Sequence, residues 1–359
     1  MAKLGEVCTI VSGSTPKTSV TSYWDGNIKW ITPAELNEDT FYIMDSIRHI
    51  TEEGKEKTGL SYLPTGTVIL SSRAPIGKTA IAGCEMCCNQ GFKNLICSDA
   101  IYNEYLYFFL KSKTDYLNSL GRGATFKEIS KSIVENIEIP LPEVNQQKEI
   151  AEKFKKLEQL ISLRKQQHAK LDELVKARFV EMFGEPYMNN KHYPLRKGES
   201  FFKLSNGKTV PEDKRLSNGV PAYGGNGISW YTNESLFNHD TIVVGRVGFQ
   251  SGNVHIAKGP LWITDNAMYM SSCDFSQYNL IFLINLMEHI DFTKFQDAGD
   301  LKKITQKPFM QYEYICPPLP LQNQFAAFVE RVDRQKQTVQ QSLEKLELMK
   351  KALMQEYFG

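Results

Sequence analysis

Two similar stretches, Pro140-Leu141-Pro142 and Pro318-Leu319-Pro320, decide the fold of this chain. Each is soon followed by an Asn-Gln pair and then by a long charged segment, which ends with Phe183-Gly184 in the first copy and Phe358-Gly359 in the second. Because a proline pushes the residue before it out of the α region, we expect each helix to begin only after these prolines. The prolines before each segment and the glycine after it predict an internal repeat in which each copy ends in a long helix.

The charged segments have the spacing of amphipathic helices, with apolar residues three and four positions apart. A helix with one apolar stripe must bury it, and the other copy is the obvious partner. We therefore predict two helices that pack on each other, each about 55 Å long at 1.5 Å per residue and each ended by its glycine. The predicted seam residues are Ile150, Phe154, Leu157, Ile161, Leu171 and Val175 in the first helix, and Phe325, Phe328, Val332, Val339, Leu346, Met349 and Leu353 in the second.

The segments that precede the two helices also correspond, more loosely. Residues 67–73 with Gly77 match residues 241–246 with Gly248, and each reads as a β-branched strand that delivers an arginine into a glycine turn. The predicted fold class is α+β, with two pseudo-repeated globular α/β domains separated by the two long helices. The predicted segments are a first globular domain at 1–143, a central helix at 144–185, a second globular domain at 186–320 and a distal C-terminal helix at 321–359.

Composition and charge exclude several classes of protein. The 359 residues are 42% hydrophobic and 23% charged, which is typical of globular chains. Lys and Arg number 42 against 41 Asp and Glu, so the net charge of +1 excludes nucleic-acid binding by bulk charge but allows a local basic groove. No apolar run approaches the ~18 residues of a membrane helix. Seven cysteines without framework spacing favour a reducing cytosol, so we expect a cytoplasmic protein away from membranes.

Two Gly-Lys-Thr triplets, Gly77-Lys78-Thr79 and Gly207-Lys208-Thr209, invite a nucleotide-binding interpretation. A phosphate loop needs another glycine five residues before the glycine of each triplet, because its backbone amides wrap the phosphates. Those positions hold Ser72 and Phe202. A turn with an exposed lysine explains both triplets.

The cysteines and histidines give no catalytic or metal site. Residues 84–88 contain one Cys-x-x-Cys spacing, but no second ligand pair follows, so buried free cysteines are preferred and zinc is the alternative. The six histidines are scattered outside any recognisable nucleophile motif. We therefore predict no catalytic residue, no metal and no cofactor in this chain.

Two aromatic, glycine-containing loops could read nucleic-acid bases. They lie at 223–231 in the second half and at 23–27 in the first, and each accompanies an arginine at a strand end and nearby lysines. Plain turns with half-buried aromatic residues are the alternative. The candidate DNA-contacting residues are Lys17, Tyr23, Trp24, Arg73 and Lys78 in the first half, and Lys208, Lys214, Arg215, Tyr223, Asn226, Trp230 and Arg246 in the second.

In their order, these motifs resemble the specificity subunit of a type I restriction-modification system. The signs are the doubled plan, the opening Gly13-Ser14-Thr15-Pro16, the tetrapeptide Trp30-Ile31-Thr32-Pro33, the turn from Ser72 to Gly77, Asn89-Gln90-Gly91, and residues 139–147 leading into a long helix. The resemblance covers essentially the whole chain. The second half departs from it, because the equivalent place has no clear Trp-Ile-Thr motif.

The resemblance implies a division of labour. Each globular domain would be a target recognition domain that reads one half of a split site in double-stranded DNA, and the two helices would pack antiparallel as a coiled coil that sets the unread spacer. The helical regions would dock two methyltransferase subunits, which transfer a methyl group from S-adenosylmethionine to adenine, and restriction subunits would join them. The chain itself would not be catalytic. In agreement, it lacks the Asp/Asn-Pro-Pro-Tyr/Phe tetrapeptide of adenine methyltransferases.

Two other functions stay open at this point. A self-contained methyltransferase or nuclease would need a cofactor or metal-carboxylate motif, which the sequence does not show. A coiled-coil scaffold that joins two modules unrelated to DNA is compatible with the same periodicity. A continuous basic groove would argue against the scaffold, whereas isolated basic spots would favour it.

Overall fold

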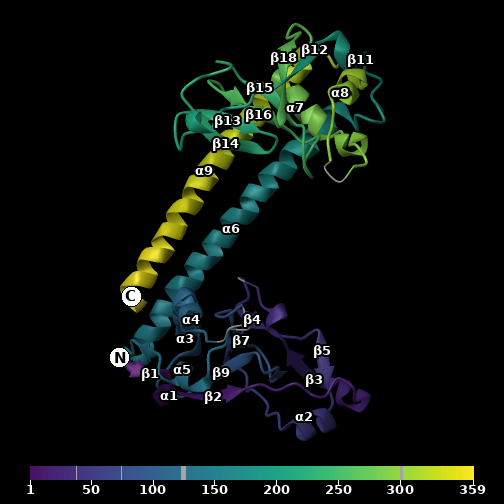
Figure 1. The fold of residues 1–359 in the computed structure, drawn as a ribbon. Coiled ribbons are helices and arrows are strands. Elements are labelled where there is room, and N and C mark those ends of the chain that lie inside the picture. The colour runs from purple at the N-terminus through teal and green to yellow at the C-terminus, as the bar shows by residue number, and fades with distance from the viewer. Residues whose placement is uncertain (38, 74, 123–126, 300–301) are drawn as a thin grey trace. The chain divides into compact units, whose positions relative to one another are not determined.

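The computed structural model describes residues 1–37, 39–73, 75–122, 127–299 and 302–359, and its internal contacts divide the chain into two units (Figure 1). Unit 1 consists of Met1–Arg164 and Ser342–Gly359, and unit 2 of Lys165–Gln341. Each unit therefore contains a globular part, the start of the helix that follows it and the end of the other long helix. The predicted helical segments 144–185 and 321–359 are thus each divided between the two units.

Unit 1 is built on a five-stranded sheet of order β2-β9-β6-β7-β4 and a three-stranded sheet of order β5-β3-β8. Helix α3 packs on β6 and β7, and its residues from Glu104 to Leu110 are all buried. This burial explains why the stretch has no polar face. The elements are β1 (Ala2–Lys3), α1 (Leu4–Val7), β2 (Cys8–Ser12), β3 (Trp24–Ile31), β4 (Tyr42–Ile43), β5 (Arg48–Ile50), α2 (Glu52–Thr58), β6 (Val68–Ser71), β7 (Thr79–Ala82), β8 (Cys87–Cys88), β9 (Phe92–Cys97), α3 (Asn103–Ser112), α4 (Thr114–Leu120), α5 (Lys131–Glu135) and β10 (Glu138–Ile139).

Unit 2 has a four-stranded sheet of order β12-β18-β15-β16 and a three-stranded sheet of order β14-β13-β17. Helix α7 packs on β15 and β16 and is buried from Phe282 to Met287. The elements are β11 (Leu195–Lys197), β12 (Phe202–Asn206), β13 (Val220–Gly224), β14 (Gly227–Thr232), β15 (Thr241–Gly245), β16 (Val254–Ala257), β17 (Trp262–Ile263), β18 (Ala267–Cys273), α7 (Leu280–Glu288), α8 (Lys307–Gln311) and β19 (Glu313–Ile315).

The two units repeat one topology. Strands β12, β18, β15 and β16 follow the order of β2, β9, β6 and β7, and the order β14-β13-β17 follows β5-β3-β8. In both small sheets the central strand pairs in parallel with the last strand. A two-stranded ladder, β1 with β10 or β11 with β19, then leads into the long helix. The predicted α+β repeat is confirmed.

The two long helices, α6 (Val144–Phe183) and α9 (Leu319–Phe358), each contain 40 residues. Both bounds of α9 lie 175 residues after those of α6 (319 against 144, and 358 against 183), so the repeat has one constant offset along the helices. Matching the two Pro-Leu-Pro stretches displaces this register by three residues. Helix α9 also begins two residues before the predicted 321, because Pro320 lies in the first turn, where a missing N–H costs nothing.

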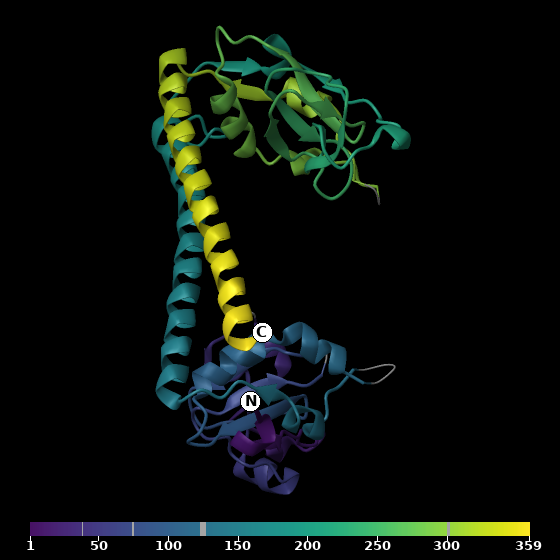
Figure 2. The same ribbon diagram turned by 90° about the vertical axis from the view of Figure 1, so that its left-hand side faces the viewer.

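In unit 1 the start of α6 and the end of α9 lie side by side. Lys153 Nζ donates to the hydroxyl of Tyr357 at 3.0 Å, and Lys350 forms an ion pair with Glu158 at 2.7 Å. Residue numbers thus rise along one helix as they fall along the other, which is the antiparallel arrangement that the resemblance implied (Figures 1 and 2).

Unit 2 shows the same direction of packing at its own helix pair. Lys336 of α9 forms an ion pair with Asp172 of α6 at 2.5 Å, and the rings of Phe183 and Phe325 meet with centroids 5.5 Å apart. Helix α6 ends at Phe183, and Gly184 adopts a φ of 75° as expected of the residue that follows a helix.

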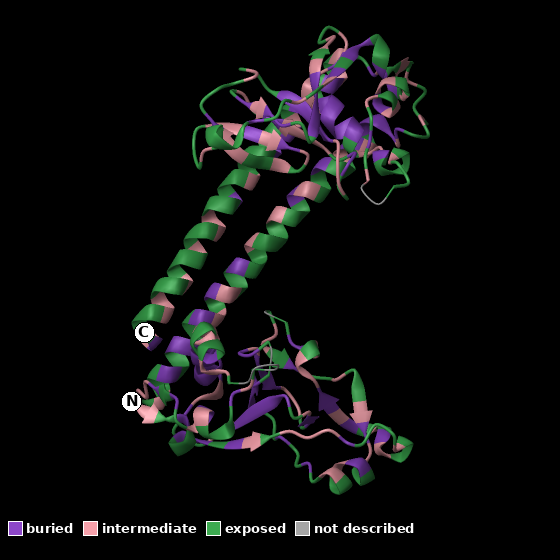
Figure 3. Ribbon diagram, viewed as in Figure 1, coloured by how far each residue is buried: buried purple, intermediate pink, exposed green. Residues whose placement is uncertain are grey.

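Most of the predicted seam is buried, with one clear exception. Met349 is 55% exposed and is a wrong assignment. In unit 1 the end of α9 packs against α3 as well as α6, with Phe358 against Tyr105, so part of its buried face contacts the globular core. Figure 3 shows exposed and buried positions alternating along both long helices. The buried seam residues are Ile150, Phe154, Leu157, Ile161, Leu171, Val175, Phe325, Val332 and Val339, and those of intermediate exposure are Phe328, Leu346 and Leu353.

Candidate nucleic-acid interface

The turns that follow β6 and β15 are held by equivalent backbone hydrogen bonds, which we call the shared backbone frame. Ile129 N donates to Ser72 O at 2.9 Å in unit 1, and Ile304 N donates to Arg246 O at 3.0 Å in unit 2. Arg246 therefore occupies the position of Ser72 rather than that of Arg73. The two arginines that the sequence analysis matched with each other are one residue out of register.

The next residues form an antiparallel bridge in each unit, and here the side chains differ in charge. Arg73 bridges Glu128 in unit 1, whereas Val247 bridges Lys303 in unit 2. The position that carries an anion in unit 1 therefore carries a cation in unit 2. One frame thus presents a different chemistry in each unit.

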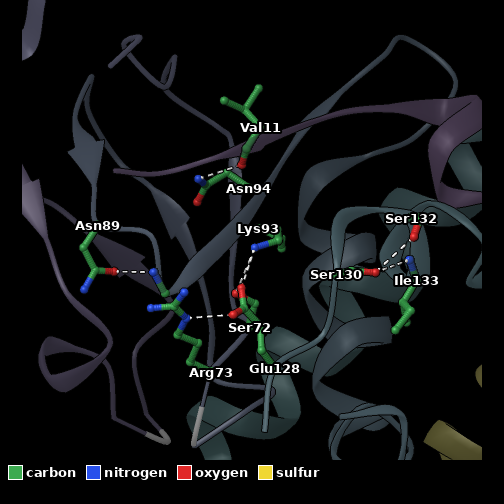
Figure 4. A network of polar contacts seen from close by, with 11 residues as sticks. Val11, Ser72, Arg73, Asn89, Lys93, Asn94, Glu128, Ser130, Ser132 and Ile133 are labelled. Carbon is green, nitrogen blue, oxygen red and sulfur yellow. Dashed lines mark hydrogen bonds and ion pairs between the residues drawn. The ribbon is translucent and has the colours of Figure 1, made fainter. Parts of the chain in front are cut away.

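Glu128 is the centre of an ion-pair network in unit 1 (Figure 4). Its carboxylate accepts from Arg73 Nε at 2.9 Å and from Lys93 Nζ at 3.2 Å, and the Lys93 side chain is only 8% exposed. Burial raises the pKa of the Glu128 carboxyl, but the hydrogen bonds from Arg73 and Lys93 outweigh this effect, and the net shift is downward. The guanidinium of Arg73 is thus already paired inside its own unit.

Lys78, a predicted DNA contact, has an internal role in the structure. Its Nζ donates to the carbonyl oxygens of Pro33 at 3.2 Å and Leu36 at 2.6 Å. These bonds hold the loop after β3 against β7, so its ammonium is directed into the unit. The prediction that Lys78 reads DNA conflicts with this placement, because leaving those carbonyls unpaired would cost free energy.

Trp24 is also part of the core rather than a free stacking surface. It is 8% exposed, meets Trp30 edge-on with centroids 5.1 Å apart, and carries the guanidinium of Arg48 3.6 Å from its ring centroid. Its indole nitrogen donates to the carbonyl of Lys17 at 3.3 Å. Tyr23 packs against the same cluster, while the Lys17 side chain is exposed.

The Trp-Ile-Thr motif missing from its expected place in the second half occurs on another strand. Trp30 of β3 donates from Nε1 to the carbonyl of Ser14 at 3.0 Å, and Trp262 of β17 donates to the carbonyl of Lys208 at 2.8 Å. Both indoles anchor the loop that follows the first strand of the large sheet. In unit 2 the tryptophan comes from the neighbouring strand, at Trp262-Ile263-Thr264, so a search at the aligned position fails.

The glycine-rich turn between β13 and β14 lies against the end of β15. A Cβ placed on Gly225 would come within 2.9 Å of Gly245 Cα, so only glycine allows this approach. The approach brings the turn that carries exposed Asn226 beside the backbone of Arg246. Tyr223, half-buried at the end of β13, faces His255 with ring centroids 6.0 Å apart.

Lys208 lies beside this region. Its neighbour Gly207 packs so closely against Thr264 that a side chain there would collide with the Thr264 carbonyl. The following residues contact Arg246, which donates from its backbone N to Asn266 O at 3.0 Å and from NH1 to Asp265 O at 3.5 Å. The structure therefore brings Lys208, Asn226 and Arg246 together around residues 264–266.

The remaining candidates of unit 2 form a separate group on the loop before β13 and on β14. The guanidinium of Arg215 lies 4.3 Å from the ring centroid of Trp230, and Lys214 forms an exposed ion pair with Glu234 at 3.0 Å. An arginine stacked on an indole is a surface that bases can also use.

The cysteine-rich segment behaves as buried core. Burial raises the pKa of Cys87 to about 11 and that of Cys88 to about 12, which disfavours the thiolate form that a metal would bind. Within the described ranges, no group of three or more His, Cys, Asp or Glu residues could hold a metal ion.

Three charged positions of this candidate interface were missed by sequence reasoning: Glu128, Lys93 and Lys303. Glu128 lies 55 residues after its partner Arg73, and no local pattern announces that contact. Only an alignment of the two halves in the correct register could have found the exchange of Glu128 for Lys303.

Comparison with known proteins settles the family. Residues 1–173 and 191–348 match the type I restriction modification DNA specificity domain. The chain belongs to this family. The specificity subunit of the type I restriction enzyme MjaIX from Methanocaldococcus jannaschii is 39% identical over 196 residues, which are 53% of this chain and 45% of that subunit. The chain thus spans less than half the length of that relative.

A second relative matches over a longer stretch. The specificity subunit of the type I restriction enzyme EcoprrI from Escherichia coli is 21% identical over 354 residues, which are 92% of this chain and 86% of that subunit. The prediction of a non-catalytic member of this family agrees with these relatives, which are specificity subunits.

Solved structures share the fold of the specificity subunit. The S subunit of a type I restriction-modification system from M. genitalium has a TM-score of 0.66 at 16% identity, over 99% of this chain and 95% of that one. A chain from a structure on complex assembly of the type I R-M system has a TM-score of 0.63 at 15% identity, over 99% and 96%. In the described part of the chain, no helix is both long and apolar enough to cross a membrane.

Proposed function

We propose that this specificity subunit reads a split target in double-stranded DNA, with one half-site for each unit. The observation that carries the proposal is the repeat of one backbone frame with different side chains at its tips. Ser72 and Glu128 in unit 1 stand where Arg246 and Lys303 stand in unit 2. Equivalent frames with different side chains suit two half-sites of different sequence, since base edges are read by side chains.

The proposed partners supply the chemistry. Two adenine methyltransferase subunits, each with its S-adenosylmethionine, dock on the helical regions, and restriction subunits join them in the cytoplasm. The target adenine has to leave the base stack to be methylated, and its pocket lies in the methyltransferase rather than in this chain. The net charge of +1 supports a subunit that shares DNA binding with its partners.

The proposed DNA contacts are the predicted residues with accessible side chains. Trp24 is left out because it is buried, and Lys78 because it donates to two backbone carbonyls. Arg73 stays because its side chain is 45% exposed beside its pair with Glu128. The proposed contacts are Lys17, Tyr23 and Arg73 in unit 1, and Lys208, Lys214, Arg215, Tyr223, Asn226, Trp230 and Arg246 in unit 2.

Single-molecule sequencing of genomic DNA, scored for N6-methyladenine with and without this gene, tests the proposal. We expect methylation to disappear from one split motif when the gene is deleted and to return when the gene is restored. If the chain co-purifies with a methyltransferase and no motif changes, the proposed function is wrong. If the deletion alters a continuous, unsplit motif, the assignment of one half-site to each unit is wrong.

A further inference from the structure

A short loop of unit 2 presents an almost fully exposed phenylalanine on a well-held backbone. Phe249 is 92% exposed. Its loop is fixed by Gly248 N, which donates to Lys302 O at 2.8 Å, and by Gln296 Nε2, which donates to Ser251 O at 2.6 Å. The exposed ring is therefore carried by a braced loop.

Three cationic residues lie on the backbone segments that hold this loop, and none has a carboxylate partner among the described residues. Arg246, Lys302 and Lys303 form no ion pair within the ranges that the structure describes. Two acidic residues are close in the backbone, but Asp265 contacts Arg246 through its carbonyl oxygen and Asp297 contacts Lys303 through its backbone N–H. Lys303 is exposed, and Arg246 and Lys302 are half-buried, so all three side chains reach solvent.

In unit 1, the cations of the same backbone frame form ion pairs with Glu128. Strand pairing places Lys93 opposite Leu70 and Met268 opposite Val244, so the buried cation of unit 1 has an uncharged counterpart in unit 2. Glu128 neutralises its neighbours in unit 1, whereas Lys303 adds a further cation at that position in unit 2. The difference lies within one shared frame and is therefore specific to the unit.

We propose that residues 246–249 and 302–303 form a clamp on the DNA backbone, in which the cations bind phosphates and Phe249 contacts the bases or sugars beside them. The inference rests on the proposed function and adds that the two half-sites are held unequally, because unit 1 has no equivalent clamp. Neutralising phosphates releases counterions, so the clamp contributes to the salt dependence of binding. An exposed aromatic ring beside phosphate-binding cations suits partial insertion or stacking against bases.

Charge reversal in the full-length chain tests the cationic part. Lys303→Glu introduces the charge that unit 1 carries, and Lys203→Glu is the matched control, because Lys203 is exposed and lies opposite Ser272 near the far end of β12 and β18. Duplex binding is measured by fluorescence anisotropy between about 50 and 200 mM salt. We expect Lys303→Glu to flatten the slope of log K against log salt by about 1 or more, on motif and random duplexes alike, and Lys203→Glu to leave it unchanged.

The apolar part has its own pair of variants. Phe249→Ala is compared with Phe275→Ala, because Phe275 is also exposed, at 57%, and follows the far end of β18. We expect Phe249→Ala to weaken duplex binding about tenfold without changing the salt slope, since base stacking does not release counterions. Thermal unfolding of each variant serves as the folding control.

The outcomes separate this inference from the proposed function. If the wild-type chain binds duplex DNA and Lys303→Glu behaves like Lys203→Glu, the clamp is wrong while the proposed function stands. If Lys303→Glu releases a methyltransferase subunit but leaves duplex binding intact, the surface docks protein and the clamp is again wrong. If the wild-type chain, alone and with its methyltransferase, binds no duplex at any salt concentration, the proposed function itself fails.

Discussion

At the scale of single residues, the carboxylate of Glu128 decides whether the cations around it are already paired within the chain. Glu128 pairs with Arg73 and with Lys93, whose side chain is only 8% exposed, so Glu128 supplies the anionic partner of a largely buried amine. The pKa of Glu128 is lowered because these hydrogen bonds outweigh its burial. In unit 2 the equivalent frame has no buried lysine to satisfy, so its Lys303 can face outward.

We predict that Glu128→Gln destabilises the chain at neutral pH by about 1–2 kcal/mol, less than a fully buried pair would cost, because Glu128 and Arg73 are partly exposed. A carboxyl whose pKa is lowered by folding stabilises the native state above its unfolded pKa, and that stability is lost as the pH falls through the folded pKa. The difference from wild type should therefore shrink in urea unfolding below about pH 4.

The matched control for this prediction is Glu135→Gln. Glu135 forms a more exposed pair with Lys131 at 3.7 Å and should change stability little. Equal effects of the two substitutions at neutral pH, or a Glu128→Gln effect that grows in acid, would contradict the role given to Glu128.

At the scale of elements, a buried glutamine joins each long helix to its globular part. Gln147 accepts from Tyr102 N at 2.8 Å and donates to the carbonyls of Ala100 and Pro142. Gln322 repeats the three bonds in unit 2, and both side chains are fully buried. This pair is separated by the same 175 residues as the helix bounds, which identifies Gln147 and Gln322 as the true register mark of the repeat.

We predict that Gln147→Leu destabilises unit 1 by about 2–4 kcal/mol, because one N–H and two carbonyl groups lose their partners in a buried place. Gln146→Leu is the control, since Gln146 is the exposed neighbour on the same helix turn. Urea unfolding followed by circular dichroism measures both. A loss for Gln146→Leu as large as that for Gln147→Leu would show that the buried bonds are not the cause.

At the scale of the whole molecule, the two helices have equal length and one register. The length of one helix can therefore be changed only if the other changes by the same amount. Contacts such as Glu158 with Lys350 in unit 1 and Asp172 with Lys336 in unit 2 depend on matched positions along both helices. A change of length in one helix alone would break one of these sets. This coupling is what the proposed reading of a split site would require of the helices.

We predict that inserting one heptad after Arg164 and another after Gln341 lengthens the unread spacer by about three base pairs, at ~1.5 Å per residue and ~3.4 Å per base step. Seven residues make nearly two full turns, so the buried stripes stay almost in phase. Methylation sequencing gives the new spacer. An unchanged spacer in an active double insertion would show that the helices do not set it, and an insertion in α6 alone should abolish methylation.

The sequence by itself determined the repeat, the two long helices, the α+β class and the family, because proline punctuation and apolar periodicity are local and survive in each half. Matching the two Pro-Leu-Pro stretches displaces the repeat by three residues, because the repeated prolines look alike while the buried Gln147 and Gln322 carry the register. The chemistry of the interface was decided only by the tertiary structure. Arg73 with Glu128, Lys78 with Pro33 and Trp24 with Arg48 are contacts between distant segments, so whether each side chain is free or already paired depends on how the chain folds.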